Sequence, residues 1–143
     1  MRAVLVAKLI ALAALLSGVL HLVWENAQAP FYAGYESFGQ HFWICLAVIP
    51  GDVVITLLIY GLVAAWRRDA TWPRQRRWQD AAAVALVGAA VAVALERHAI
   101  SAGRWSYTAA MPVIPYLGVG LTPVLQMAIL LPLSFYLAGK LLR

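Results

Sequence analysis

Four long apolar stretches constrain the fold of this chain more than any other feature of its sequence. A helix that crosses a bilayer needs roughly 20 consecutive, mostly apolar residues. Stretches of this kind lie at residues 4–24, 42–66, 81–100 and 121–142, and they leave little of the 143-residue chain for a soluble domain. The sequence therefore predicts an all-α, polytopic membrane protein in which residues 1–143 form a single transmembrane four-helix bundle.

The composition agrees with lipid as the main solvent. The chain is 64% hydrophobic and only 12% charged, which is too little polar surface for a water-soluble globule of this size. The only cysteine, Cys45, can form neither an internal disulfide nor a CxxC motif. The sequence carries no P-loop and no nucleophile elbow, so neither P-loop nucleotide binding nor acyl transfer is expected. No cofactor is indicated.

The positions of the basic residues predict the orientation of the bundle. Short loops rich in Lys and Arg stay on the cytoplasmic side of a membrane. With four spans, the two termini and the middle loop share one face, and they hold nine of the eleven basic residues: Arg2, Lys8, Arg67, Arg68, Arg74, Arg76, Arg77, Lys140 and Arg143. This predicts an N-in, C-in protein of the inner (cytoplasmic) membrane. The net charge of +5 then indicates contact with membrane lipids rather than with nucleic acid.

The N-terminal segment also resembles a secretory signal. Arg2 and Lys8 precede an apolar run, and Ala27-Gln28-Ala29 fits an A-x-A cleavage site. We expect the segment to be retained as the first span, because its apolar run is longer than that of an ordinary signal peptide. At the other end of the chain, Thr122 followed by Pro123 predicts the N-cap and first residue of the last helix.

Ionisable side chains inside the apolar stretches are the main pointers to function. Such groups cost a few kcal/mol each at membrane depth, so they mark candidate functional sites. His21 and Glu25 are four residues apart and share one helix face. Asp52, Glu96 and Gln126 lie on the other three helices, in the same predicted half of the bilayer. We therefore predict Glu25, His21, Glu96 and Asp52 as catalytic residues, and Gln126 as a ligand-binding residue.

Aromatic residues gather in the two loops beside these polar groups. Their rings either form an interfacial belt or line a pocket for an apolar ligand. We predict the following as ligand-binding residues in addition to Gln126: Trp24, Tyr32, Trp43, Arg104, Trp105 and Tyr107.

Carboxyl groups in this setting suit acid–base chemistry on a lipophilic molecule. Removal from water favours the neutral form of a carboxyl group, so one can act as a general acid while a partner stays ionised. This combination can protonate a carbon–carbon double bond or an epoxide, and aromatic faces can stabilise the resulting cation. The predicted substrate is a lipophilic small molecule that arrives from the bilayer.

Two short motifs resemble those of known membrane enzymes. The segment His21-Leu22-Val23-Trp24-Glu25 resembles the H-x-x-x-E motif of the emopamil-binding, sterol-isomerase-like (EXPERA) family. Trp24-Glu25 followed by Phe31-Tyr32 is similar to the W-E motif of small integral-membrane terpene cyclases. These resemblances imply that Glu25 is the acid, that His21 tunes it, and that Glu96 or Asp52 is the base. The predicted reaction is therefore an isomerisation or a cyclisation.

Each polar group also has a purely structural interpretation. His21 and Glu25 could fix helix register, Asp52 could be a neutral packing donor to Tyr60 or to a neighbouring helix, and Glu96 with Arg97 could form an interfacial ion pair with Arg104. A metal site could draw on His21, Glu25, His41, Asp52, Glu96 and His98, but no metal is predicted because no HExxH-like motif is present.

Two further classes of function stay open at this stage. A small transporter would use the same carboxyl groups as a proton relay, and it would need a homodimer to provide room for alternating access. A non-catalytic accessory subunit would pack against a larger membrane complex through its small residues.

Overall fold

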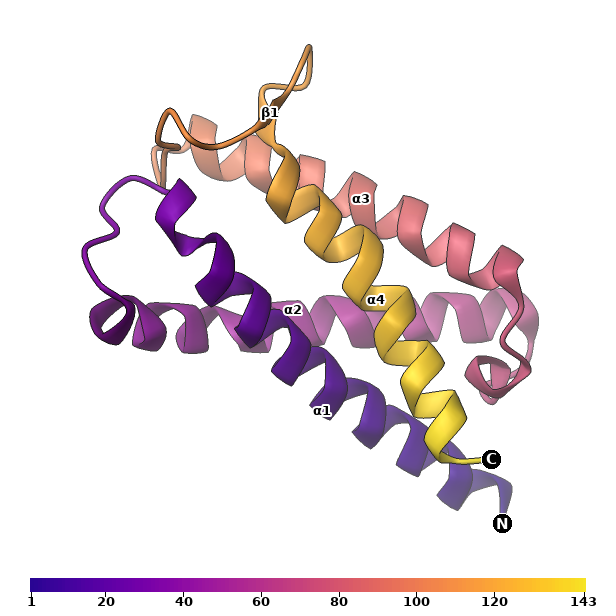
Figure 1. The fold of residues 1–143 in the computed structure, drawn as a ribbon. Coiled ribbons are helices and arrows are strands. Elements are labelled where there is room, and N and C mark those ends of the chain that lie inside the picture. Colours follow the sequence, from indigo (N-terminus) through magenta and orange to yellow (C-terminus); the bar gives the residue numbers. More distant parts are fainter.

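The computed structural model describes all of residues 1–143 and consists mainly of four long helices (Figure 1). They are α1 (Arg2–Gln28), α2 (Phe38–Arg67), α3 (Trp78–Ser101) and α4 (Leu121–Leu141). Each is long and apolar enough to cross a membrane. The prediction of a mostly helical chain with four helices long and apolar enough to span a membrane is therefore confirmed, and every helix overlaps its predicted span.

The connections are short elements at the two ends of the bundle. The 3-10 turn η1 (Ala29–Phe31) follows α1, and η2 (Trp72–Gln75) lies between α2 and α3. Between α3 and α4, β1 (Val113–Ile114) pairs antiparallel with β2 (Val119–Gly120).

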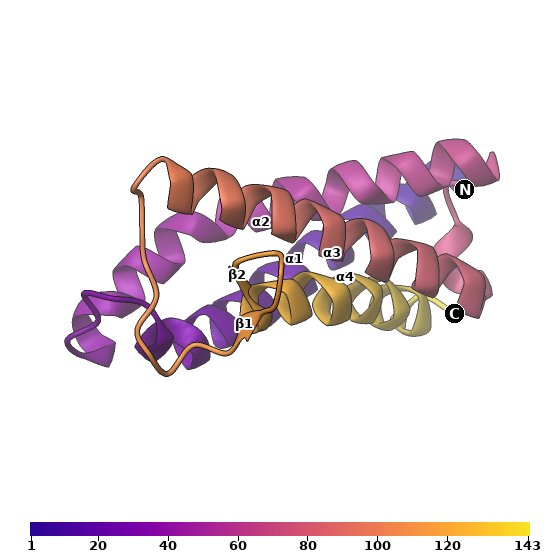
Figure 2. The same ribbon diagram turned by 90° about the horizontal axis from the view of Figure 1, so that it is seen from above.

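The two ends of the bundle differ in what they contain. Both termini and the α2–α3 connection lie at one end, which we call the arginine end (Figure 1). The α1–α2 and α3–α4 connections lie at the opposite end, which we call the loop end. In space the helices follow the order α2, α1, α4, α3, each packing on the next, whereas α2 and α3 contact each other little (Figure 2). The ring of helices is therefore weakly closed along the seam between α2 and α3.

Small residues allow α3 and α4 to approach closely. The buried face of α3 repeats about every four residues, as a helix face should, and consists of Asp80, Val84, Gly88, Ala92, Glu96 and Ala99. A Cβ atom on Gly88 would lie 2.8 Å from the carbonyl oxygen of Met127 on α4. The helix backbones are thus as close as glycine permits, and α3 is held with Glu96 facing the bundle interior.

The start of α4 differs from the prediction. The N-cap is Gly120 and not Thr122, because pairing of Gly120 with Val113 keeps its backbone extended immediately before the helix. Pro123 consequently occupies the third helical position. The Thr122 hydroxyl donates to the Met111 sulfur at 3.4 Å instead of capping the helix.

Candidate functional site: a polar cavity at the loop end

A cavity of about 420 Å³ lies among the four helices at the loop end, and we call it the polar cavity. Three acidic residues from three different helices line it: Glu25 of α1, Asp52 of α2 and Glu96 of α3. Its wall also contains apolar side chains from every helix except α1. A small cavity with a few convergent polar groups in an apolar wall is the usual form of a small-molecule site.

Gln126 of α4 is the centre of the hydrogen bonds on one side of the polar cavity. Its Nε2 atom donates to Glu25 Oε1 at 2.9 Å and lies 2.9 Å from His21 Nδ1. Its Oε1 atom accepts a hydrogen bond of 2.7 Å from Gln28 Nε2. One amide side chain therefore contacts three polar residues that share one face of α1.

His21 lies behind the cavity wall and is completely buried. Because Nδ1 accepts from Gln126, the proton of the neutral ring is on Nε2, and Nε2 has no hydrogen-bond partner. Nδ1 also lies 3.5 Å from Asp52 Oδ2, and this buried oxygen makes no hydrogen bond. Asp52 thus lies beside His21 without a side-chain hydrogen bond, so it does not act as a packing donor.

The polar groups continue from His21 toward the middle of the bundle and then stop. Thr56 Oγ1 donates to the Asp52 carbonyl oxygen at 2.8 Å, so Ser17 is the donor in its 2.7 Å bond with Thr56. On α1 the next buried residues toward the arginine end are Ala13 and Leu9. The connected polar side chains therefore reach the loop end of the bundle and do not continue to the arginine end.

Glu96 is held from the opposite side of the polar cavity by two aromatic residues of the α3–α4 loop. Its Oε2 atom accepts hydrogen bonds from the Trp105 indole at 3.3 Å and from the Tyr107 hydroxyl. Burial and the hydrogen bond to Glu96 raise the pKa of Tyr107, so its phenol keeps the proton it donates. The Tyr107 oxygen accepts from the Gly120 N–H at 2.9 Å. Glu96 makes no ion pair with either nearby arginine, which rules out that structural interpretation.

The two loops are joined directly above the polar cavity. Tyr32 and Tyr107 form an antiparallel bridge, and the Ala33 N–H donates to the Ser106 carbonyl at 2.9 Å. The Tyr32 ring meets the rings of Trp105 and Tyr107 edge-on, at centroid distances of 6.3 and 5.5 Å. These contacts give the polar cavity an aromatic roof made of two segments far apart in sequence.

The polar cavity opens sideways through the seam between α2 and α3. Three of its lining residues are large, apolar and substantially exposed: Ile44 and Val48 of α2, at 58% and 47%, and Leu95 of α3, at 45%. On helices that cross a membrane, such residues face lipid. The carboxyl groups of the polar cavity therefore lie behind an apolar rim at this seam.

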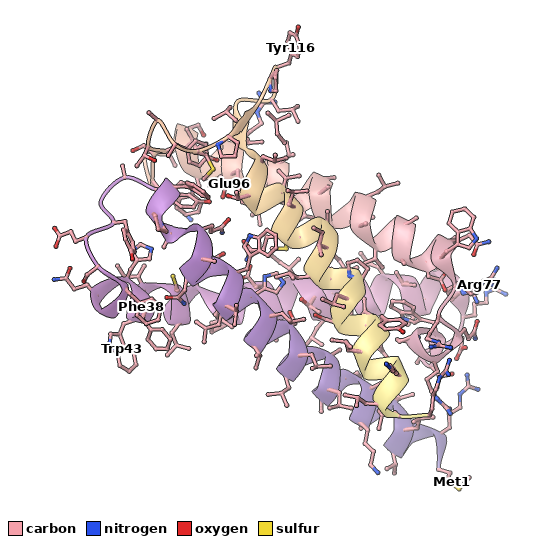
Figure 3. The ribbon with its side chains drawn as sticks, in the orientation of Figure 1. Met1, Phe38, Trp43, Arg77, Glu96 and Tyr116 are labelled. Atoms are coloured by element: carbon pink, nitrogen blue, oxygen red, sulfur yellow. The ribbon has the colours of Figure 1, made fainter.

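The structure places most of the predicted site residues in or beside the polar cavity. Tyr32, Arg104, Trp105 and Gln126 line it with the three acidic residues, while His21 and Tyr107 contact residues that line it. Two residues do not take part in this way. The Trp24 indole donates to the Thr122 carbonyl at 3.2 Å and ties α1 to the start of α4, and Trp43 is exposed and points away from the bundle (Figure 3).

Sequence reasoning did not select three polar residues that belong to this site. His41 and Cys45 line the polar cavity on the same face of α2 as Asp52, and Gln28 does so on the face of α1 that carries Glu25. Their helical spacing places them on the same helix faces as the predicted site residues, and this spacing is the sequence feature that indicates them.

The chemistry available here rests on carboxyl, amide, imidazole and aromatic groups. No group of three or more His, Cys, Asp and Glu side chains is placed to hold a metal ion. Comparisons with protein-family models, with curated proteins and with solved structures gave no match.

Proposed function

We propose that this chain is an integral membrane protein that binds a lipophilic small molecule in the polar cavity and isomerises or cyclises it by acid–base chemistry. The observation that carries the proposal is a cavity lined by Glu25, Asp52 and Glu96 whose opening is rimmed by exposed apolar residues. Buried carboxyl groups are costly, and structural needs in a small bundle are normally met by small residues and weak hydrogen bonds.

The hydrogen bonds favour Glu25 as the acid and Glu96 as the base. The Gln126 amide donates to one Glu25 oxygen, so the other can carry a proton that faces the substrate. Glu96 Oε2 accepts hydrogen bonds from the Trp105 indole and the Tyr107 hydroxyl. Donors to a carboxyl group stabilise its ionised form, and Glu96 has two of them. Asp52, beside His21, is the alternative base.

These roles give a reaction that balances without a cofactor. Glu25 transfers its proton to one carbon of a double bond, and the cation forms on the neighbouring carbon. The Tyr32 and Trp105 rings lie in the cavity wall and stabilise this cation. Glu96 then removes a proton from an adjacent carbon, which leaves a shifted double bond. If a second double bond attacks the cation first, the new carbon–carbon bond closes a ring and the cation moves to the second double bond, where Glu96 removes an adjacent proton. In either case the proton returns from Glu96 to Glu25 before the next turnover.

The resemblance of the His21-to-Glu25 segment to sterol-isomerase-like proteins, and of Trp24-Glu25 to membrane terpene cyclases, supports the same class of reaction. We further propose that the arginine end faces the cytoplasm, which makes the chain N-in and C-in in the inner membrane. The polar cavity then lies in the outer half of the bilayer.

Mass spectrometry of lipids that co-purify with the protein tests this function. We expect the wild type to retain a discrete isoprenoid or sterol-like molecule, and Glu25→Gln to lose it or to retain it in a chemically altered form. Glu36→Gln is the matched control, because Glu36 is an exposed loop residue that makes no side-chain hydrogen bond. Bulk phospholipid alone in all three samples, with unchanged folding, would overturn the proposal.

One observation favours a second candidate, an accessory subunit of a larger membrane complex. Tyr116 is fully exposed at the tip of the β1–β2 hairpin, which projects from the bundle (Figure 3). Its φ of 67° is unusual for a residue other than glycine. A protein that co-purifies at fixed stoichiometry, is lost in Tyr116→Ser and is retained in Glu25→Gln would favour this candidate.

A further inference from the structure

A second cavity, of about 290 Å³, lies at the arginine end and is separate from the polar cavity. It is bounded by η2, the first turn of α3 and the last turns of α4. Its polar lining consists of Gln75, Arg76, Arg77, Asp80 and Tyr136, and the exposed Trp78 stands beside them. We call it the headgroup cavity, for the ligand argued below.

Two guanidinium groups of the headgroup cavity have no acidic partner. The arginines that pair with acidic residues are Arg2, with Asp69, and Arg67, with Asp80. Arg76 instead lies over the Tyr136 ring, 5.8 Å from its centre, and Arg77 extends from the same end of the bundle as Met1 (Figure 3). Adjacent unpaired arginines beside an aromatic ring are suited to binding a phosphate group.

A buried carboxyl group in the same wall lacks hydrogen bonds. Asp80 is only 2% exposed, and neither of its side-chain oxygens has a hydrogen-bond partner. Its one cationic neighbour is Arg67, whose Nε atom lies 3.7 Å from Oδ1. Buried polar groups are almost always hydrogen-bonded, because an unmet one costs about 1–3 kcal/mol. A ligand that supplies N–H donors would satisfy Asp80.

We infer that the headgroup cavity binds a phospholipid whose headgroup carries a primary ammonium next to its phosphate. The phosphate contacts Arg76 and Arg77, and the ammonium donates to Asp80. The cavity lies where four apolar helices end and where exposed Trp78 marks an interface, so acyl chains attached to this headgroup extend beside the lipid-facing sides of α3 and α4. This site does not depend on the reaction proposed for the polar cavity.

Native mass spectrometry with three lipids of identical acyl chains tests the inference. Delipidated full-length protein is mixed with dioleoyl phosphatidylethanolamine, phosphatidylcholine or phosphatidylglycerol, and the bound fraction is measured. Phosphatidylethanolamine should bind about tenfold more tightly than phosphatidylcholine, whose quaternary ammonium has no N–H to donate. Phosphatidylglycerol, which has phosphate and hydroxyl groups but no ammonium, should fall between them.

Three variants test which residues contact the lipid headgroup. Asp80→Asn should bring the phosphatidylethanolamine-to-phosphatidylcholine ratio close to one, and the double variant Arg76→Gln/Arg77→Gln should weaken binding of all three lipids. Arg74→Gln is the matched control, because Arg74 belongs to the same loop but does not line the headgroup cavity. If Asp80→Asn fails to fold, the lipid preference of the wild type tests the ammonium contact, and the double variant tests the phosphate contacts.

Three results would overturn the inference. The first is equal binding of the three lipids by the wild type. The second is unchanged binding by the arginine variant in a folded protein. The third is binding of soluble phosphoethanolamine as tight as that of the lipid, which would assign the cavity to a water-soluble ligand.

Discussion

The arginine end and the loop end of this small bundle differ in how closely their elements pack. At the arginine end, a Cβ atom on Gly139 of α4 would lie 2.3 Å from the Pro73 carbonyl oxygen, and the Trp72 and Phe135 rings pack with centroids 5.0 Å apart. The Trp72 indole also donates to the Tyr60 carbonyl at 3.3 Å. At the loop end, the helices separate around a cavity, and buried polar atoms of His21 and Asp52 have no hydrogen bonds.

This difference indicates that the two ends of the helices contribute differently to stability and to binding. Close backbone contact and aromatic packing at the arginine end fix the four helices relative to one another. That packing offsets the cost of the cavities and the unmet buried polar groups, which lie at both ends of the bundle: His21 and Asp52 at the loop end, Arg67 and Asp80 at the arginine end. Changes at the close backbone contacts of the arginine end should therefore affect mainly folding, whereas changes at the polar groups of the loop end should affect binding as well.

The largest effect on stability is expected for Gly139→Val. The added side chain collides with the backbone at Pro73, so α4 must move away from η2. We expect the free energy of unfolding in detergent to fall by about 3 kcal/mol. Gly61→Val is the control, because a Cβ at Gly61 meets no atom within 4 Å. Equal unfolding curves for the two variants would contradict the close contact.

Gln126→Leu should have the next largest effect. It removes the amide that bonds Glu25 and Gln28 and contacts His21, which leaves buried groups unpaired at about 1–3 kcal/mol each. We expect a lower free energy of unfolding and the loss of any bound lipophile. Ser134→Ala is the matched control on α4, because the Ser134 hydroxyl bonds only the Leu130 carbonyl of its own helix. Similar unfolding of both variants would show that Gln126 is not the bridge between α1 and α4.

A smaller effect, of about 1 kcal/mol, is expected for Tyr107→Phe. The change removes the donor to Glu96 and the acceptor for the Gly120 N–H, so the roof of the polar cavity should loosen. Hydrogen exchange of the peptide that contains Gly120 should accelerate, while exchange at the arginine end stays unchanged. Tyr35→Phe serves as the control, since the Tyr35 hydroxyl makes no hydrogen bond, and acceleration in that variant as well would contradict the assignment.

The smallest effect, with a defined pH dependence, is expected for Asp69→Asn at the arginine end. Hydrogen bonds from the Thr71 N–H and hydroxyl, with Arg2 nearby, lower the pKa of Asp69 below its ordinary value of 3.8. A lowered pKa stabilises the fold above the ordinary value, and this contribution is lost as the pH falls through the folded-state pKa. Unfolding of the wild type and the variant should therefore differ at neutral pH and converge in acid. A difference that persists in acid would contradict this origin.

The sequence predicts the helices well because membrane spans follow from local composition. Likewise, the four-residue spacing of His21 and Glu25 is enough to place both on one helix face. The position of Gln126 against them depends on the register between α1 and α4, which packing determines and local pattern does not.

Three features of the loop end could not be predicted from local sequence patterns. The bridge from Tyr32 to Tyr107 joins segments 75 residues apart, so the roof over Glu96 could not be foreseen. The opening at the seam reflects weak packing between α2 and α3, which is a property of the whole bundle. The start of α4 was predicted at Thr122 because capping preferences were applied without the hairpin that places Gly120.

Photo-cross-linking of a lipophile to the protein in lipid nanodiscs tests most directly whether the polar cavity takes its ligand from the bilayer. The probe is a diazirine-bearing isoprenoid alcohol, and labelled positions are mapped by peptide mass spectrometry. A ligand in the polar cavity predicts labels at residues 44–52 and 92–96 that an excess of the unlabelled alcohol removes, while labels at lipid-facing Leu58 and Leu86 persist. Labels confined to lipid-facing positions and unaffected by the competitor would contradict a lipophile-binding site at the loop end.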